Sequence, residues 1–244
     1  MSRVVLKLGG SVVTEKDQPE TVAAERLAAL AADLAAFDGS LVVVHGGGSF
    51  GHYHASEHGV SRTTGSTDAA AARAITDAMR ELNDAVVGAL ADAGVPAVPV
   101  HPFSVAARDE DGSLTLPTAA VAGMLDEGFV PVLHGDVITH AGEGVTILSG
   151  DELVVALAES LAADRVGLCS AVPGVLDTDG EVVSTIESFD AVADALGESD
   201  ATDVTGGMAT KVRELLGLSA PAHVFDADSA AAFLAGDSPG TRID

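Results

Sequence analysis

The sequence is poor in cysteine, basic residues and aromatic residues, and the first two shortages each exclude a class of protein. Cys169 is the one cysteine among 244 residues, so neither a disulfide framework nor a cysteine-based zinc site can form. Tryptophan is absent, and only three of the 12 basic residues are lysine. Without a cluster of basic residues, the chain has little to bind nucleic-acid phosphates or an anionic membrane surface. We therefore expect neither nucleic acid nor a membrane as a partner.

Long apolar runs are missing as well. No run reaches the roughly 18 residues that a membrane-spanning helix requires. The opening residues Met-Ser-Arg-Val-Val-Leu-Lys turn polar too soon for a secretory signal. These absences predict a soluble protein of the cytoplasm.

Acidic residues, in contrast, are abundant. Aspartate and glutamate number 37, which gives a formal net charge of −25, while 47% of the residues are hydrophobic and can form a core. At molar salt the Debye length is about 3 Å, so the mutual repulsion of these carboxylates is screened. The composition therefore indicates a halophilic source with a salt-rich cytoplasm.

Short β-branched runs alternate with alanine-rich segments along the whole chain. The runs predict strands at Val4–Leu8, Leu41–His45, Ala97–Val100, Val130–Leu133, Arg165–Cys169 and Ala222–Phe225. Helical spacing predicts helices at Val22–Phe37, Asp68–Ala93, Asp151–Ala163, Phe189–Leu196 and Ser229–Ala235. Hairpin turns are expected at Asp109–Gly112 and Asp177–Gly180. The alternation predicts a single α/β domain over residues 1–244, with a mostly parallel central sheet covered by helices on both faces, a three-layer αβα sandwich.

Glycine-rich turns follow strands or open helices at four places. They are Gly9-Gly10-Ser11, Gly46-Gly47-Gly48-Ser49, Ser149-Gly150-Asp151 and Gly206-Gly207-Met208. Any single turn can be a simple connection, but successive backbone N–H groups at such turns also bind anions. Four turns, three of them close to lysine or histidine, favour a phosphate site.

A dinucleotide site is an alternative for the second turn, because Gly46–Gly51 matches the pattern G-x-G-x-x-G. That site needs a helix that starts at the glycines and an acidic residue at the end of the next strand, about 20 residues on. We expect a loop that carries His52 and continues to Gly59, and Asp68 stands where a helix begins. The dinucleotide interpretation is therefore disfavoured.

The three lysines, Lys7, Lys16 and Lys211, all stand at or near a glycine turn. An ammonium group is a compact charge suited to phosphate oxygens. His52 follows the second turn, where its ring could reach an anion, whereas His54, His58, His140 and His223 are expected to be solvated.

These motifs, in this order, resemble the amino-acid-kinase superfamily over essentially the whole chain. The matching segments are Lys7–Ser11, Val44–Gly48, Thr205–Met208 with Lys211, and the ending Gly240–Ile243. Within the superfamily, Gly46–His52 resembles isopentenyl phosphate kinases, and fosfomycin kinases are similar there. The usual T-D-V-x-G-V-Y nucleotide segment is replaced by Ser170–Leu176.

The resemblance implies Mg²⁺-dependent transfer of a phosphoryl group from ATP to isopentenyl phosphate, a step of isoprenoid precursor synthesis. It implies a homodimer whose N-terminal half binds the acceptor and whose C-terminal half binds the nucleotide. Lys7 and Lys16 would act on the transferring group, and Asp151 would orient lysines. The nucleotide would contact Lys7, Gly9, Gly10, Ser11, Gly48, Asp177, Gly206, Gly207 and Lys211. The acceptor would contact Gly47, His52 and Gly150, with Ile75 and Met79 at its apolar tail, and no side chain would ligate a metal.

Three alternatives remain open. The chain could be a fosfomycin-type kinase, or a carboxylate or carbamate kinase of the acetylglutamate kind, or a nucleotide-binding module without catalytic activity. Joint retention of the three lysines argues against the last of these.

Overall fold

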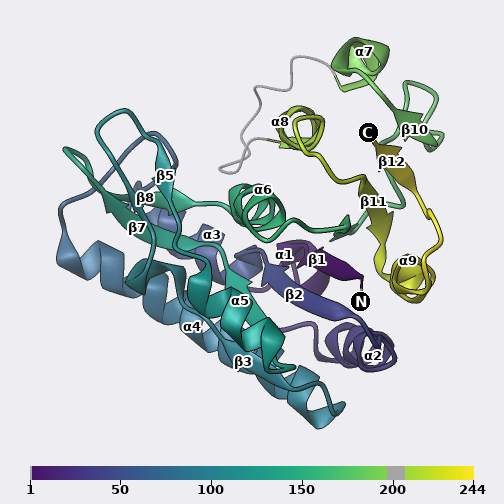
Figure 1. The fold of residues 1–244 in the computed structure, drawn as a ribbon. Coiled ribbons are helices and arrows are strands. Elements are labelled where there is room, and N and C mark those ends of the chain that lie inside the picture. Colours follow the sequence, from purple (N-terminus) through teal and green to yellow (C-terminus); the bar gives the residue numbers. More distant parts are fainter. Residues whose placement is uncertain (1, 197–206) are drawn as a thin grey trace.

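Eight strands form the central sheet of the computed structural model, which describes residues 2–196 and 207–244 (Figure 1). In sheet order they are β10 (Thr185–Ile186), β12 (Thr241–Ile243), β11 (Ala222–Asp226), β9 (Arg165–Ser170), β1 (Arg3–Leu8), β2 (Ser40–His45), β6 (Val130–His134) and β3 (Ala97–Pro99). Neighbouring strands are parallel except β11 and β12. The predicted mostly parallel sheet is confirmed.

Helices cover both faces of this sheet. They are α1 (Gly10–Val13), α2 (Ala24–Ala35), α3 (Gly48–Glu57), α4 (Ala69–Asp92), α5 (Ala119–Asp126), α6 (Gly150–Ser160), α7 (Ala193–Leu196), α8 (Gly207–Leu215) and α9 (Ala230–Ala235). Short 3₁₀ turns lie at Pro102–Ser104, Phe189–Ala191 and Ala227–Ser229. The arrangement is the predicted αβα sandwich.

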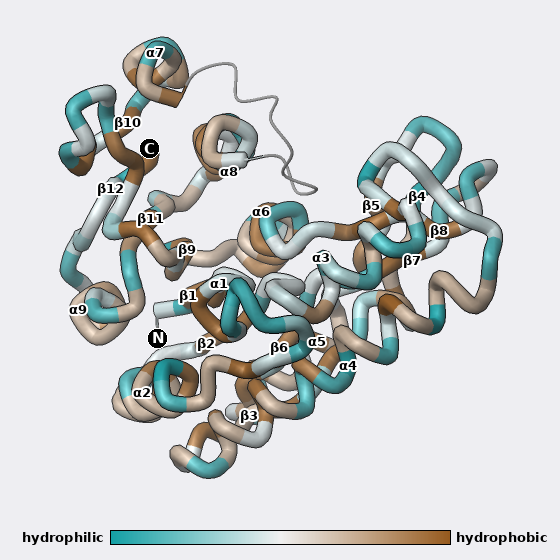
Figure 2. Tube along the Cα trace, turned by 180° about the vertical axis from the view of Figure 1, so that it is seen from behind, coloured by the Kyte–Doolittle hydropathy of each residue, from teal (hydrophilic) through white to brown (hydrophobic). Residues whose placement is uncertain are grey.

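The alternation of side chains along the strands explains the two layers of helices. Val5 and Val42 point to the face packed by α5, α6 and α8, whereas Leu6 and Val43 point to the face packed by α1, α2, α4 and α9. Because successive strand residues face opposite sides, a strand covered on both faces is apolar throughout. Figure 2 shows this pattern, with hydrophobic residues concentrated in the central strands and on the helix faces next to them.

Two predicted segments differ from the structure. The segment Phe189–Leu196, expected as one helix, is a 3₁₀ turn followed by α7, because Val192 between them buries its side chain and leaves the helical conformation with φ −125°. The segment after Gly46, expected as a loop, contains the helix α3. The turns at Asp109–Gly112 and Asp177–Gly180 are present as predicted.

A second, smaller sheet was not predicted from the sequence beyond its first turn. It orders β5 (Leu114–Thr115), β4 (Ala107–Arg108), β7 (Asp136–His140) and β8 (Gly144–Leu148). The chain passes from β6 of the central sheet into β7 through the single residue Gly135. The smaller sheet therefore starts at the carboxyl end of a central strand, next to the edge where the glycine turns lie.

The carboxyl ends of β1, β2, β6 and β9 share one edge of the central sheet. Strand β1 lies inside the sheet, with β2, β6 and β3 on one side of it and β9, β11, β12 and β10 on the other. The strand order therefore extends outward from β1 in both directions. In open α/β sheets, ligands bind at such a switch point. Within residues 2–196 and 207–244, none of the helices combines the length and the apolar character that crossing a membrane would require.

Candidate active site

A cavity of about 950 Å³ opens at this edge of the sheet and gathers most of the residues predicted from the sequence. The predicted residues that line it are Lys7, Gly9, Gly10, Ser11, Lys16, Gly47, Gly48, His52, Ile75, Met79, Gly150, Asp151 and Lys211. They come from segments as far apart as β1 and α8, which only the fold brings together.

Three predicted nucleotide contacts are not in that lining. Gly206 lies outside the described residues, and Gly207 is the first residue of α8 but does not line the cavity. Asp177 stands in the turn before β10, where its carboxylate accepts hydrogen bonds from the backbone N–H groups of Asp179 and Glu181, both at 2.9 Å. In this structure the carboxylate of Asp177 organises its own turn.

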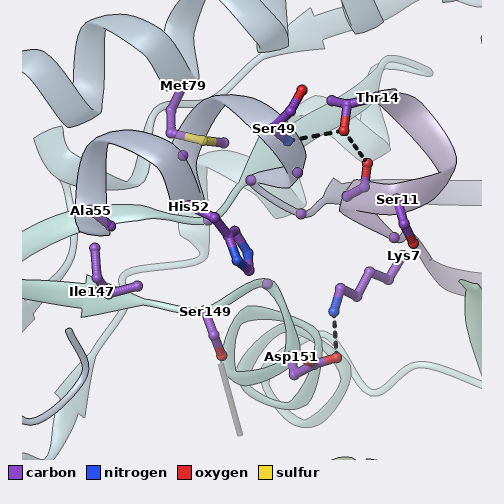
Figure 3. Close-up of a pocket in the computed structure, with 18 of the residues that line it drawn as sticks. Lys7, Ser11, Thr14, Ser49, His52, Ala55, Met79, Ile147, Ser149 and Asp151 are labelled. Carbon is purple, nitrogen blue, oxygen red and sulfur yellow. Dashed lines mark hydrogen bonds and ion pairs between the residues drawn. The ribbon is translucent and has the colours of Figure 1, made fainter. Parts of the chain in front are cut away.

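The first two glycine turns lie against each other, and this contact requires glycine. A Cβ atom on Gly10 would lie 2.3 Å from the backbone nitrogen of Gly48, and Gly48 itself has a φ of +48°. Thr14 ties the turns together, because its hydroxyl donates to the carbonyl of Gly10 at 2.7 Å and accepts from the N–H of Ser49 at 3.0 Å (Figure 3). Helices α1 and α3 therefore begin side by side at the cavity.

Helix α3 corrects the expectation of a loop after the second turn. It starts at Gly48, so one requirement of a dinucleotide site is met after all. The other is not, because Asp68 caps α4 by accepting from the N–H of Ala70 at 2.8 Å and does not end a strand. His52 consequently lies on a helix rather than on a loop, and its ring points into the cavity (Figure 3).

Asp151 joins two of the three lysines. Its Oδ1 lies 2.6 Å from Nζ of Lys7 on β1, and its Oδ2 lies 3.1 Å from Nζ of Lys211 on α8. Burial alone would raise the pKa of the Asp151 carboxyl, but the two ammonium groups outweigh burial and hold that pKa below its usual value. Burial lowers the pKa of Lys7, the neighbouring Lys211 adds to this, and Asp151 opposes both. The result is a carboxylate kept ionised between two cations.

The start of α6 places Asp151 at this position. Ser149 caps the helix and forms a capping box with Glu152, so the first turn is fixed by its own sequence. Gly150 follows, and a Cβ atom there would lie 3.1 Å from Cε of Lys7. A side chain at residue 150 would therefore press on the lysine that Asp151 holds.

One part of the cavity is apolar. Ile75 and Met79 come from α4, Ala55 from α3 and Ile147 from β8, and all four line the cavity. In Figure 3, Met79, Ala55 and Ile147 lie on one side of His52, and Lys7 with Asp151 lies on the other. The cavity thus has a cationic end and an apolar end, with an imidazole between them.

Asp136 is a cavity residue that sequence reasoning missed. It is only 2% exposed, and its carboxylate accepts from the N–H of Val137 at 2.8 Å and from the hydroxyl of Thr76 at 3.1 Å. Burial raises the pKa of this carboxyl to about 7, although both hydrogen bonds oppose the shift. A signal was available, because His134-Gly135-Asp136 repeats the pattern of a strand followed by glycine and a polar residue. Thr14, Ser49 and Ser149 were also missed, and short hydroxyl residues near turns carry no such signal.

Three of the histidines expected to be solvated are not. His140, on β7, is half-buried, and its Nδ1 lies 3.1 Å from the hydroxyl of Thr146. His223 lies inside β11 and is 1% exposed. The side chain of His54, on α3, is 19% exposed and lies 2.8 Å from a carboxylate oxygen of Glu20. His58, the residue that ends α3, is exposed as expected.

Known proteins match this chain over nearly its whole length. The model of the amino acid kinase family matches residues 2–226. An isopentenyl phosphate kinase of Haloferax volcanii is 66% identical, over 100% of this chain and 99% of its own. One from Methanocaldococcus jannaschii is 31% identical, over 98% of each chain. A crystal structure of an isopentenyl phosphate kinase superposes with a TM-score of 0.85 at 28% identity, covering 99% of this chain and 100% of the other.

Proposed function

The chain belongs to the amino acid kinase family, and from this premise we propose that it transfers the γ-phosphoryl group of ATP to isopentenyl phosphate. The product is isopentenyl diphosphate. The observation that carries the proposal is the two-ended cavity, where lysines and glycine turns are separated from an apolar wall by His52. An acceptor with a phosphate head and a short hydrocarbon tail fits that division.

The cationic end supports binding and transfer of a phosphoryl group. Phosphoryl transfer is catalysed chiefly by positioning and by neutralising charge on the transferred group. We assign Lys7 and Lys16 to that group, together with the backbone N–H groups of Gly9, Gly10 and Gly48. Lys211 and Ser11, with Gly206 and Gly207, would hold the remaining nucleotide phosphates, and Asp177 stays a prediction for the nucleotide.

Asp151 acts through the lysines. Because each of its oxygens contacts an ammonium group, it fixes both Nζ positions and offsets the repulsion between the two positive charges. A salt-bridged carboxylate is a poor proton acceptor, so Asp151 does not serve as a general base. None is needed, because a phosphate monoester has a second pKa of about 6 and its oxygen is already ionised at neutral pH.

The acceptor lies towards His52 in this proposal. The imidazole, with the backbone N–H groups of Gly47 and Gly150, would bind the acceptor phosphate. Ile75 and Met79 would contact the tail. Both side chains are 1% exposed and pack in the core. Each would contact the tail with the side that faces the cavity.

Magnesium fits the site through phosphate oxygens rather than through protein ligands. Mg²⁺ keeps several waters and few protein contacts when it binds nucleotides. Both oxygens of Asp151 already contact ammonium groups, of Lys7 and Lys211, which disfavours this carboxylate as a magnesium ligand. Bound to the nucleotide, the ion would supply further neutralisation of phosphate charge.

One assay tests the function. Purified protein with ATP, Mg²⁺ and molar KCl is offered isopentenyl phosphate, methyl phosphate, fosfomycin or acetylglutamate, and ADP release is measured. We expect efficient turnover of isopentenyl phosphate and a much lower kcat/KM for methyl phosphate, which lacks the tail. Equal kcat/KM values for the two phosphates would show that contacts with the tail do not contribute to turnover. Preference for fosfomycin or acetylglutamate would reassign the acceptor, and no ADP release with any acceptor would indicate a binding module.

We also propose a homodimer in a salt-rich cytoplasm. Among the described residues, the short edge strand β3 pairs with β6 alone. Phe129, next to β6, is 45% exposed, which gives a surface that a second copy could cover. Sedimentation equilibrium in molar KCl tests this, and a single species with the mass of one chain would contradict it.

A further inference from the structure

A second cluster of potential ligands lies outside the cationic end of the cavity, where α3 ends. His54, Glu57 and His58 each offer a donor atom, and these atoms lie within 4.8 Å of one another. The spacing i, i+3 and i+4 places the three side chains on one face of the helix. We propose that they bind one divalent transition-metal ion, such as Zn²⁺, Co²⁺ or Ni²⁺, at a site distinct from the nucleotide's magnesium.

The hydrogen bonding of His54 prepares it as a ligand. Its Nε2 lies 2.8 Å from Oε1 of Glu20, and a carboxylate only accepts, so Nε2 carries the proton. In a neutral ring, Nδ1 then holds a free lone pair. Among residues 2–196 and 207–244, Nδ1 of His54 finds no hydrogen-bond partner although it is buried, and it faces Oε2 of Glu57 at 3.8 Å. Metal-binding histidines characteristically donate their other N–H to a carboxylate in this way.

The distances suit a small ion after minor side-chain movement. Two ligands that bind a tetrahedral ion at about 2.1 Å lie about 3.4 Å apart, slightly closer than the 3.8 Å between His54 and Glu57 here. His58 is exposed and terminates the helix, so its ring can turn towards the other two. The partly exposed position leaves the fourth place to water.

The donor set selects the kind of ion. Two imidazoles and one carboxylate suit Zn²⁺, Co²⁺ and Ni²⁺, whereas Mg²⁺ prefers an all-oxygen shell. The formal net charge of −25 favours any cation near the surface, but it does not distinguish between cations. Selectivity for transition metals over Mg²⁺ is therefore the property that separates a built site from general attraction.

The position also connects the ion to the cavity. Glu20 belongs to the loop that carries Lys16, and the N–H of Glu20 donates to the carbonyl of Ser49 on α3 at 3.2 Å. Glu57 lines the cavity. An ion at His54 would therefore fasten the end of α3 and, through Glu20, the loop of Lys16.

Cobalt spectroscopy tests the proposal on the untagged, full-length protein. The protein is stripped with a chelator and titrated with Co²⁺ at pH about 8, above the ordinary histidine pKa of about 6.5. Visible d–d absorption reports the ligands. We expect saturation at one equivalent, displacement by Zn²⁺ and no displacement by excess Mg²⁺.

Four variants assign the ligands and their support. His58→Ala and Glu57→Gln should each weaken Co²⁺ binding at least about tenfold, and Glu20→Gln, which removes no ligand, should weaken it by about tenfold as well. His140→Ala removes a histidine on β7, far along the chain, and should bind as the parent does. Three results would overturn the proposal. Co²⁺ binding would not saturate, Mg²⁺ would compete it away, or the affinity would be unchanged in both His58→Ala and Glu57→Gln. Because His58 and Glu57 are exposed, these variants should fold, which circular dichroism verifies.

Discussion

Lys7 donates a 2.6 Å hydrogen bond to Asp151, a residue 144 positions further along the chain, in the wall of the cavity. The contact joins the end of the central strand β1 to the first turn of α6. A buried ammonium group is costly unless a carboxylate accompanies it, so this pair lets the cavity keep a positive charge in its wall. The same carboxylate also reaches Lys211, which makes it the common support of both cations.

Asp151→Asn should therefore impair both catalysis and stability. The amide keeps the shape of the side chain but cannot neutralise two lysines, so Lys7 and Lys211 should lose their positions. We expect kcat to fall about 100-fold, as misplacement by about 1 Å can cause. We also expect a loss of about 3 kcal/mol in the free energy of unfolding, measured with urea.

The control for this variant is Glu159→Gln, which removes an exposed carboxylate from the same helix. It should change neither kcat nor the urea midpoint. A kcat within twofold of the parent in Asp151→Asn would show that the lysines do not need this support.

Lys16→Ala separates catalysis from folding, because Lys16 lines the cavity but is exposed. We propose that Lys16 stabilises the transferring group, so its loss should lower kcat by about 100-fold to 1,000-fold. The thermal midpoint should stay where it is. Arg73→Ala, which removes an exposed cation on α4, is the matched control and should leave kcat unchanged. Near-normal turnover of Lys16→Ala would take this lysine out of the mechanism.

His52→Ala should act on the acceptor alone. A hydrogen bond to a charged group contributes about 2 kcal/mol, so the KM for isopentenyl phosphate should rise roughly 30-fold. The KM for ATP should stay constant, since the nucleotide contacts are assigned to other residues. Steady-state kinetics with each substrate varied in turn measures both constants. A rise in the KM for ATP with none for the acceptor would place His52 at the nucleotide instead.

Asp136 should give the protein a specific pH dependence. Its pKa is about 7 in the folded protein against an ordinary value of 3.8, so the folded state keeps a proton that the unfolded state releases. This lowers the free energy of unfolding as pH rises from about 4 to about 7, by up to about 4 kcal/mol, with no further change above. Asp136→Asn removes this contribution, so its stability relative to the parent should increase over that range.

The comparison between the parent and Asp136→Asn removes the contributions of titrating groups that do not contact Asp136. Burial lowers the pKa of His45 to about 4 and, with the charge of His45 adding to it, that of His134 to about 3. These histidines give the opposite slope, because the unfolded state binds their protons first. His45 is common to both proteins, whereas Nδ1 of His134 lies 3.8 Å from Oδ2 of Asp136, so the measured difference reports Asp136 together with its effect on His134. Urea titrations at several pH values supply the difference, and a difference independent of pH would contradict the raised pKa.

Salt should stabilise the protein strongly. With a formal net charge of −25, the folded chain repels itself at low ionic strength. Raising KCl from about 0.1 M to about 1 M shortens the Debye length from about 10 Å to about 3 Å and should raise the thermal midpoint. Scanning calorimetry over this range measures the effect. A midpoint that stays flat or falls would show that the acidic surface is no adaptation to salt.

The strands, most helices and the positions of the glycine turns could be predicted from the sequence. These features depend on neighbouring residues: β-branched runs, alanine-rich spacing and glycines that end strands. The expected loop at Gly46–Gly59 was wrong for the same reason, because the polar and glycine-rich segment of α3 carries no clear helical pattern and owes its helix to packing against α1 and α4.

Which residues meet in the site depends on how the chain folds. The pairing of Asp151 with Lys7 and Lys211, the contact of Gly10 with Gly48 and the burial of Asp136 all join segments that are distant along the chain. Charge balance, close backbone approach and desolvation are properties of that three-dimensional neighbourhood, and local sequence does not encode them. The sequence singled out lysines near glycine turns and suggested that Asp151 orients lysines, and the fold shows that Lys7 and Lys211 are the two that share its carboxylate.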